Sequence, residues 1–408
     1  MLDWISRFGI CCFLDNNQYD LPGHSMECIA AAGCISDTPD RNQDLRSAGD
    51  FIAKQHDWIF GHLGYDLKNE TEGLVSAHPD YIGFPDAFFF VPEYVIMIEG
   101  NSARIGSLSQ DHEEVFRDIN SAIRKSSTQA PIMIRERTGK EEYLETVRKL
   151  QQHILRGDCY EINFCMEFYA ENALIDPLAS YRELSAISPN PFSAFYRLND
   201  RYLLCASPER YLKRSGIQII SQPIKGTAPR DTSDSGSDTF LGEQLYTSAK
   251  DRSENVMVVD LVRNDLSKVC LEGSVKVDEL FGIYTFPQVY QMMSTISGTL
   301  RSGVSFEEII RASFPMGSMT GAPKKKVMQL IEKYEKTKRG IFSGSVGYIN
   351  PEKDFDFNVV IRSIMYHAGD RHLSFLTGSG ITFYSDPEKE YGECQLKALA
   401  IKKVLQAG

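Results

Sequence analysis

The sequence predicts an α+β protein that is built mainly from antiparallel sheet. Residues 1 to about 135 contain short alternating runs, such as DAFFFVPEYVIMIEG, which Gly, Pro and Asn interrupt. A second series of strand-like runs begins near residue 158, and its strands do not alternate regularly with helices. Because a doubly wound parallel fold needs that alternation, we expect an antiparallel arrangement instead.

A strong helix is predicted in TGKEEYLETVRKLQQHILRGD. Thr138 and Glu141 have the spacing of a capping box, and Gly157 can close the other end. Between them, apolar residues fall on one helical stripe, formed by Tyr143, Val147, Leu150 and Ile154. We place a boundary here, between an N-terminal strand-rich region at 1–137, packed with the rest, and a catalytic region at 138–408.

The catalytic region continues with further strands and helices. Strands are expected in YEINFCMEFYA, NPFSAFYRL, RYLLCASPERYL and IQIISQPI, and later in DFNVVIRSIMYHAG and RHLSFLTGSGITFYS. Helices are expected over about 242–263, near 305–313 and near 321–334. A last helix begins in SDPEKEYGEC, with Pro387 at an early helical position.

The composition limits the function. The chain has 408 residues, of which 42% are hydrophobic, and its net charge is −11. This charge argues against a general binder of nucleic acid or anionic membranes, because both need a basic face. An anionic substrate would need a local cationic pocket or a metal. The nine scattered cysteines form no CxxC pair, which favours a reducing, cytoplasmic compartment, and no apolar run approaches the ~20 residues of a membrane span.

Two of the predicted helices carry acids where a core-facing stripe is expected. In KDRSENVMVVDLVRND, Asp251 and Glu254 share a face with Val258 and Leu261. In PEKEYGECQLKALAIKKVLQ, a stripe beside the apolar face consists of Glu390, Glu393 and Lys397. A buried carboxylate without a partner costs several kcal/mol, so these acids need cations. Ion pairs with lysine or arginine would meet that need, and so would Mg²⁺ between the helices; the periodicity leaves both interpretations open.

A single lysine, Lys225, lies in SQPIKGTAPR. It is typical of a solvated loop, but it could also bind a carboxylate as a point charge or act as a nucleophile. A two-residue turn at Ser215-Gly216 would place Glu209, in SPERY, opposite Gln222 and near Lys225. A nucleophile must lose its proton, which burial or a divalent cation would favour and the Glu209 carboxylate would oppose.

Ten segments, in this order along the chain, resemble the chorismate-utilising enzymes, and within them the branch of the aminodeoxychorismate (para-aminobenzoate) synthases. They are GDCYEINF, SPERY, PIKGTAPR, KDRSENVMVVDLVRNDL, STISGTL, FPMGSMTGAPK, RGIFSGSVGYI, VVIRS, TGSGI and SDPEKEYGECQLKA. The resemblance covers about residues 140 to 405, and FGHLGYDLKNE at 60–70 is similar to the N-terminal region of this branch. It implies a sandwich core of large antiparallel sheets with helices packed outside.

Lys225 is similar to the lysine of that branch, whereas related anthranilate synthases usually have alanine there, in PIAGT. The resemblance implies that Lys225 attacks C2 of chorismate while the C4 hydroxyl leaves with a proton from Glu209. Ammonia then adds at C4 and displaces the lysine. The product would be 4-amino-4-deoxychorismate, in para-aminobenzoate and folate biosynthesis.

The same match implies the remaining site residues. Glu254 and Glu393 would be the principal Mg²⁺ ligands, with Glu390 and Asp251 behind them or binding through water. The metal would hold the ring carboxylate of chorismate. The residues implied to bind the substrate or line its site are Thr227, Thr320, Tyr348, Arg362, Gly378, Ser379, Gly380 and Lys397.

Two positions depart from the family pattern. Glu161 stands where many relatives have glutamine, and Gln291 where many have histidine. The isochorismate- and salicylate-forming branches have a lysine at the Glu161 position, so we do not expect an isochorismate synthase. Glu161 could shift the pKa of Lys225, and Gln291 is expected to form a hydrogen bond on the substrate side.

No segment resembles a glutaminase nucleophile, so ammonia is expected from solution or from a separate glutaminase subunit. One alternative is an anthranilate synthase component I or another Mg-dependent chorismate-converting enzyme, against which Lys225 argues. Another, from a different class, is a non-catalytic chorismate-binding subunit that only activates a glutaminase. The presence of candidate acid, nucleophile and metal ligands argues against it.

Overall fold

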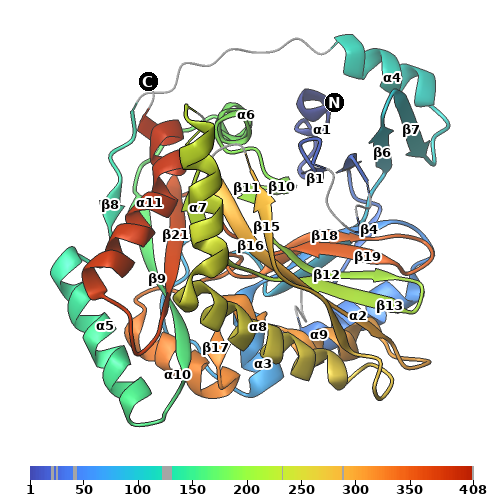
Figure 1. Cartoon of the computed structure of the whole chain (residues 1–408). Coiled ribbons are helices and arrows are strands. Elements are labelled where there is room, and N and C mark those ends of the chain that lie inside the picture. Colours follow the sequence, from blue (N-terminus) through green and yellow to red (C-terminus); the bar gives the residue numbers. More distant parts are fainter. Residues whose placement is uncertain are drawn as a thin grey trace.

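Two large sheets form the centre of the molecule, and helices pack against them (Figure 1). The computed structural model of the chain describes residues 1–19, 23, 26–39, 44–121, 131–231, 233–286 and 289–406. Every strand pairing among these residues is antiparallel. The predicted α+β fold with large antiparallel sheets is therefore confirmed.

The larger sheet has eleven strands in the described part of the chain. Their order is β17 (Gly321–Ala322), β9 (Glu161–Ala170), β21 (His372–Ile381), β20 (Ser363–His367), β11 (Arg201–Ser207), β10 (Phe192–Leu198), β1 (Ile10–Asp15), β2 (Cys28–Ala32), β6 (Tyr94–Glu99) and β7 (Ser102–Ser107), with β8 (Arg135–Glu136) paired to β9.

The smaller sheet has ten strands among the described residues. Their order is β14 (Ile224–Pro229), β16 (Val289–Thr299), β13 (Gln218–Gln222), β12 (Arg210–Ser215), β19 (Phe355–Asn358), β18 (Ser345–Ile349), β4 (Ile59–Leu63), β5 (Ala87–Val91) and β3 (Ser36–Asp37), with β15 (Lys276–Thr285) paired to β16.

The helices lie around these sheets (Figure 1). They are α1 (Leu2–Ile5), α2 (Leu45–Lys54), α3 (Lys68–Glu72), α4 (His112–Ser121), α5 (Lys140–Leu155), α6 (Pro177–Ile187), α7 (Ser235–Thr247), α8 (Ala249–Ser267), α9 (Phe306–Ser313), α10 (Lys324–Tyr334) and α11 (Pro387–Gln406), and two short 3₁₀ helices, η1 (Tyr65–Leu67) and η2 (Gly317–Met319).

Both sheets combine strands from either side of residue 138. In the larger sheet β10 pairs with β1, and in the smaller sheet β18 pairs with β4. The regions at 1–137 and 138–408 therefore both contribute strands to each of the two sheets.

Adjacent residues of one strand reach two different hydrophobic cores. Cys12 lies in the core that joins the two sheets and includes residues of α2, α8 and α9. Cys11 lies in the core that includes residues of α5, α6, α10 and α11. Because side chains alternate along a strand, the larger sheet is buried on both faces here. Both cysteines are buried free thiols, so they fill the sheet and form no bridge.

Two helix predictions needed correction. The helix expected over 242–263 is instead α7 followed by α8, because Ser248 between them has an extended backbone (φ −61°, ψ 111°) and its side chain caps α8. The capping box of Thr138 and Glu141 is wrong: Gly139 is the N-cap of α5 and makes no side-chain cap. Gly157, with φ 80°, lies in the left-handed conformation expected after the helix end.

The hairpin before Lys225 differs in register from the prediction. Its turn comes one residue later, because Ser215 pairs with Gln218, and a bulge between Arg210 and Lys213 then places Arg210 opposite Gln222. A further irregularity between residues 224 and 227 interrupts the pairing of β14 with β16. Lys225 therefore lies at a break in the ladder, where strict alternation does not decide its direction.

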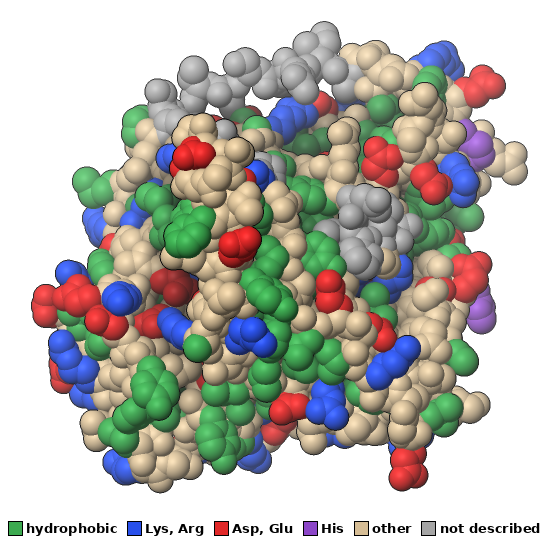
Figure 2. Space-filling model, viewed as in Figure 1, with side chains coloured by type: hydrophobic (Ala, Val, Ile, Leu, Met, Phe, Trp, Pro, Cys, Tyr) green, Lys and Arg blue, Asp and Glu red, His purple; other side chains and the backbone are tan. Residues whose placement is uncertain are grey.

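No helix among the described residues is long and apolar enough to cross a membrane. On the face shown in Figure 2, Lys and Arg side chains are interspersed with Asp and Glu. An acidic chain of this kind must bind an anion through a local group of cations rather than through a general basic surface.

Candidate active site

A cavity of about 630 Å³ lies where β14 and β21 meet α8 and α11. Ten of the predicted site residues line it: Glu209, Lys225, Thr227, Asp251, Glu254, Arg362, Gly378, Gly380, Glu393 and Lys397. These residues are separated by up to 188 positions in the chain (397 minus 209), so it is the fold that brings them together.

Three predicted residues lie behind the cavity wall. The Thr320 hydroxyl donates to the carbonyl of Met316 at 3.1 Å. The Ser379 hydroxyl lies 2.9 Å from that of Tyr143, and both are buried. Glu390, only 1% exposed, accepts a hydrogen bond from Lys250. In this structure these residues support the wall and do not line the cavity.

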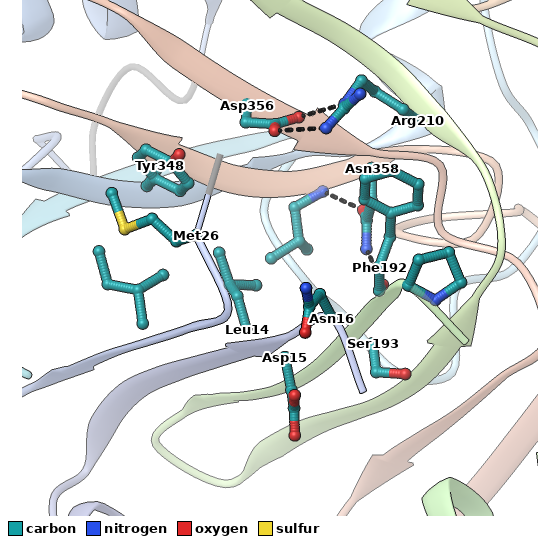
Figure 3. A pocket seen from close by; sticks show the side chains of 13 residues that line it. Leu14, Asp15, Asn16, Met26, Phe192, Ser193, Arg210, Tyr348, Asp356 and Asn358 are labelled. Atoms are coloured by element: carbon teal, nitrogen blue, oxygen red, sulfur yellow. Dashed lines mark hydrogen bonds and ion pairs between the residues drawn. The ribbon is translucent and has the colours of Figure 1, made fainter. Parts of the chain in front are cut away.

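Tyr348 lies in a different place from the other predicted site residues. It lines a separate cavity of about 60 Å³ beside Met26, Asn16 and the Arg210–Asp356 ion pair (Figure 3). Phe342, six residues earlier in RGIFSGSVGYI, lines the larger cavity instead.

Sequence patterns do not single out Phe342, because it precedes β18 and strand alternation does not place it. Ser343 after it has φ 62°, a turn that periodicity cannot predict. Asn163 and Ser318 also line the cavity and were missed.

Lys225 forms an ion pair with Glu161. The ammonium Nζ lies 2.7 Å from Glu161 Oε1, and the Glu161 side chain is almost fully buried. A methyl group built on Gly380 would lie 3.0 Å from Glu161 Oε1, 3.1 Å from Glu254 Oε2 and 3.3 Å from Lys225 Nζ. Three charged groups therefore meet beside this glycine, and Lys225 is not a solvated loop residue.

The surrounding acids hold Lys225 in its charged form. Burial by itself would lower the pKa of the lysine, but the carboxylates of Glu161 and Glu254 outweigh burial and raise it. At neutral pH this lysine is therefore a cation and not a nucleophile.

Glu209, by contrast, is shifted toward its uncharged form. Burial raises the pKa of its carboxyl group to about 7, although the Lys225 ammonium opposes the rise. Arg362 lines the same cavity, and the partial burial of its guanidinium lowers its pKa while Glu209 opposes that change. A carboxylic acid with a pKa near 7 is suited to donate a proton at neutral pH.

The acids of α8 and α11 have the chemistry of a Mg²⁺ site. Among the described residues, Glu254 Oε1 and Glu390 Oε2 are buried and have no hydrogen-bond partner. Burial raises the pKa of Glu254 to about 7. For Glu393, burial would raise the pKa, but Lys397, 2.7 Å away, and Lys250 outweigh it and lower the pKa. Carboxylate oxygens of this kind are the ligands that Mg²⁺ prefers.

In their present arrangement, these acids are not gathered around one point. Within the described ranges, no three Asp, Glu, His or Cys side chains are close enough together to hold a metal ion. The sequence predicted Glu254, Glu393, Glu390 and Asp251 as the Mg²⁺ ligands, and lysines contact three of these four residues.

Gln291 places a buried amide without a partner in the described cavity wall. The side chain is 0% exposed and lines the cavity, and neither its Oε1 nor its Nε2 has a hydrogen-bond partner in the described structure. A buried amide without partners costs about 1–3 kcal/mol, which a bound ligand would recover.

Comparison with known proteins gives a consistent result. The family described as chorismate binding enzyme matches residues 20–403. Aminodeoxychorismate synthase component 1 of Escherichia coli is 33% identical over 90% of this chain and 79% of its own length. Anthranilate synthase component 1 of Thermus thermophilus is 32% identical over 85% of this chain and 77% of its own length. The chain spans only 43% of a probable chloroplastic aminodeoxychorismate synthase from rice, at 33% identity over 86% of this chain.

A solved structure supports the fold. Anthranilate synthase component I of Streptococcus pneumoniae superposes with a TM-score of 0.82 over 94% of each chain, at 23% identity. The sandwich of antiparallel sheets predicted from the sequence is therefore the fold of known chorismate enzymes.

We expect Glu209 to make the metal-free protein less stable as the pH rises from 4.5 toward 7. The folded state keeps a proton on Glu209 up to a pKa of about 7, whereas the unfolded chain releases it near the ordinary value of 4.5. Because the folded state binds more protons in this window, the free energy of unfolding falls with pH. Urea unfolding of the natural chain and of Glu209→Gln at pH 4.5 to 8 measures the effect. The stability of the natural chain relative to the variant should fall across the window, and parallel curves would contradict the assignment.

Proposed function

The chain belongs to the chorismate binding enzyme family, and we propose that within it the chain converts chorismate and ammonia to 4-amino-4-deoxychorismate. The observation that carries the proposal is that Lys225 and Glu209 share one cavity with the acids of α8 and α11. The similarity to the E. coli enzyme supports the same branch of the family.

The size and charges of the cavity suit a small dianion. Its volume of about 630 Å³ lies in the usual range of pockets for small ligands. Arg362 and Lys397 line it and provide positive charge, and Gly378 and Gly380 form its wall along β21. A bound Mg²⁺ would supply further positive charge for a carboxylate of the substrate.

The proposed reaction begins when Lys225 loses a proton. Glu161 Oε1 already accepts a hydrogen bond from this ammonium at 2.7 Å and is therefore placed to take the proton. The neutral amine forms a bond to C2 of chorismate as the C4–oxygen bond breaks, and Glu209 donates a proton so that the hydroxyl leaves as water. Ammonia then forms a bond to C4, and the bond from C2 to Lys225 breaks. The net change replaces the C4 hydroxyl by an amino group and releases one water.

The ammonia is proposed to come from a separate glutaminase component. The E. coli and T. thermophilus relatives are both named component 1, which indicates enzymes made of more than one component. With ammonium salt in place of the glutaminase, the chain alone should carry out the reaction.

Anthranilate synthesis is the second candidate. The T. thermophilus anthranilate synthase component is nearly as similar to this chain as the E. coli relative. The two reactions differ in their products: anthranilate forms with loss of pyruvate, whereas 4-amino-4-deoxychorismate keeps the enolpyruvyl group. Identification of the product by mass therefore decides between them.

We expect the purified chain with chorismate, Mg²⁺ and ammonium to form the 4-amino product, and Lys225→Ala to lose it, because alanine cannot attack C2. Lys389, which lines the same cavity and is exposed, provides the matched control Lys389→Ala. Product analysis by mass spectrometry measures both variants. Unchanged rate and product in Lys225→Ala would remove the nucleophilic role, and anthranilate from the natural chain would favour the second candidate.

Glu161→Gln should lower the pKa of Lys225. The glutamine keeps a hydrogen-bond acceptor but removes the carboxylate that contributes most to the raised pKa. The fraction of neutral lysine at a given pH then increases, so the pH dependence of Lys225 modification by an amine-reactive reagent should shift to lower pH. Labelling of Lys225, quantified by peptide mass spectrometry from pH 7 to 11, measures the shift. Identical labelling curves for the variant and the natural chain would show that Glu161 does not control this lysine.

A further inference from the structure

Lys250 connects the acidic faces of α8 and α11. It lies in the first turn of α8, and its Nζ is 2.8 Å from Glu390 Oε1 on α11 and 3.7 Å from Glu254 Oε1 on its own helix. A cation at this position stands between the two helices whose acids are the expected Mg²⁺ ligands.

One ammonium group does not satisfy both acids. The distance of 3.7 Å to Glu254 is too long for a hydrogen bond. In the described structure, Glu254 Oε1 and Glu390 Oε2 therefore stay without a hydrogen-bond partner, although the two residues are only 7% and 1% exposed. A divalent ion takes six or more oxygen ligands, so it would use oxygens that Lys250 leaves unsatisfied.

The side chain of Lys250 can also move away from these acids into solvent. Its side chain is 44% exposed, whereas that of Glu390 is 1% exposed. A lysine is a point charge on a flexible four-carbon stem, so it can move its ammonium group into solvent while the buried acids stay in place. A divalent cation bound by the free oxygens of these two carboxylates would lie close to the Lys250 ammonium, and the two positive charges would repel each other.

We propose that Lys250 competes with the divalent cation for Glu254 and Glu390 and thereby sets the affinity of the enzyme for the metal. The inference rests on the Mg²⁺ dependence of the proposed function. Lys397 holds Glu393, at 2.7 Å, and also donates to the carbonyl of Gly378, so it is tied to the cavity wall on a second side. Lys250 is therefore the group whose removal frees carboxylate oxygens with the least change to the wall.

The test measures metal binding without substrate. Mn²⁺ binding to the full chain is followed through the electron paramagnetic resonance signal of free Mn²⁺, for the natural chain and for Lys250→Met, which keeps the apolar stem. We expect the variant to bind Mn²⁺ about 10-fold more tightly or better, because the ion no longer displaces a paired ammonium. Lys389→Met removes a cation from the same cavity that has no ion pair among the described residues, and it should leave the affinity unchanged.

A second variant and a second readout keep the test decisive. Lys250→Arg retains the charge and should restore the natural affinity. Without metal, Lys250→Met should unfold at a lower temperature than the natural chain because two buried acids lose their cation. With saturating Mg²⁺, its rise in melting temperature should exceed that of the natural chain.

Equal or weaker Mn²⁺ binding by Lys250→Met, or no binding by either protein, would overturn the competition. The product assay with chorismate is scored separately. A 4-amino product together with unchanged metal affinity in Lys250→Met would reject this inference and keep the proposed function. Anthranilate together with tighter metal binding by the variant would reject the proposed function and keep the inference.

Discussion

The structure of the site depends on one constraint: carboxylates buried in a protein need cations close to them. Glu161, Glu254 and Glu390 are each less than a tenth exposed, and each is contacted by a lysine, either Lys225 or Lys250. These pairs join β9 to β14 and α8 to α11, which come from distant parts of the chain. The ion pairs that meet the electrostatic need therefore also fix where the elements of the cavity lie.

Local irregularities in otherwise regular strands and helices bring the members of these ion pairs together. The interruption of β14 near Lys225 lies against α8, where the left-handed Gly226 comes close to Asp251. The break at Ser248 starts α8 with Lys250 in its first turn. A continuous helix through this point or an uninterrupted strand would have different residues facing the cavity. The irregularities are thus part of how the site is built.

Sequence patterns predicted those parts of the molecule that repeat, such as the antiparallel strands, the apolar stripe of α5 and the acidic faces of α8 and α11. They did not predict the break at Ser248 or the register of the β12–β13 hairpin, because a single cap or bulge leaves little trace in a periodic pattern. Motif order assigned Tyr348 to the substrate, but the chain turns at Ser343 and places Phe342 at the cavity. Periodicity could not pair Lys225 with Glu161, which belongs to a different sheet, whereas the family resemblance did place Glu161 where it could shift the pKa of Lys225.

The same acids favour the charged form of Lys225, whereas its proposed role needs the neutral form. In the proposed reaction Lys225 must be neutral to attack a carbon atom, yet the carboxylates around it outweigh burial and raise its pKa. Glu209 must instead carry a proton in order to donate it, and burial keeps a proton on that group near neutral pH. Positive charge that arrives with metal would weaken the hold of Glu254 on the lysine proton, and Glu161 would then remain as the acceptor at hydrogen-bond distance. In the proposed reaction, a site arranged in this way would keep Lys225 charged and unreactive until the cavity is loaded.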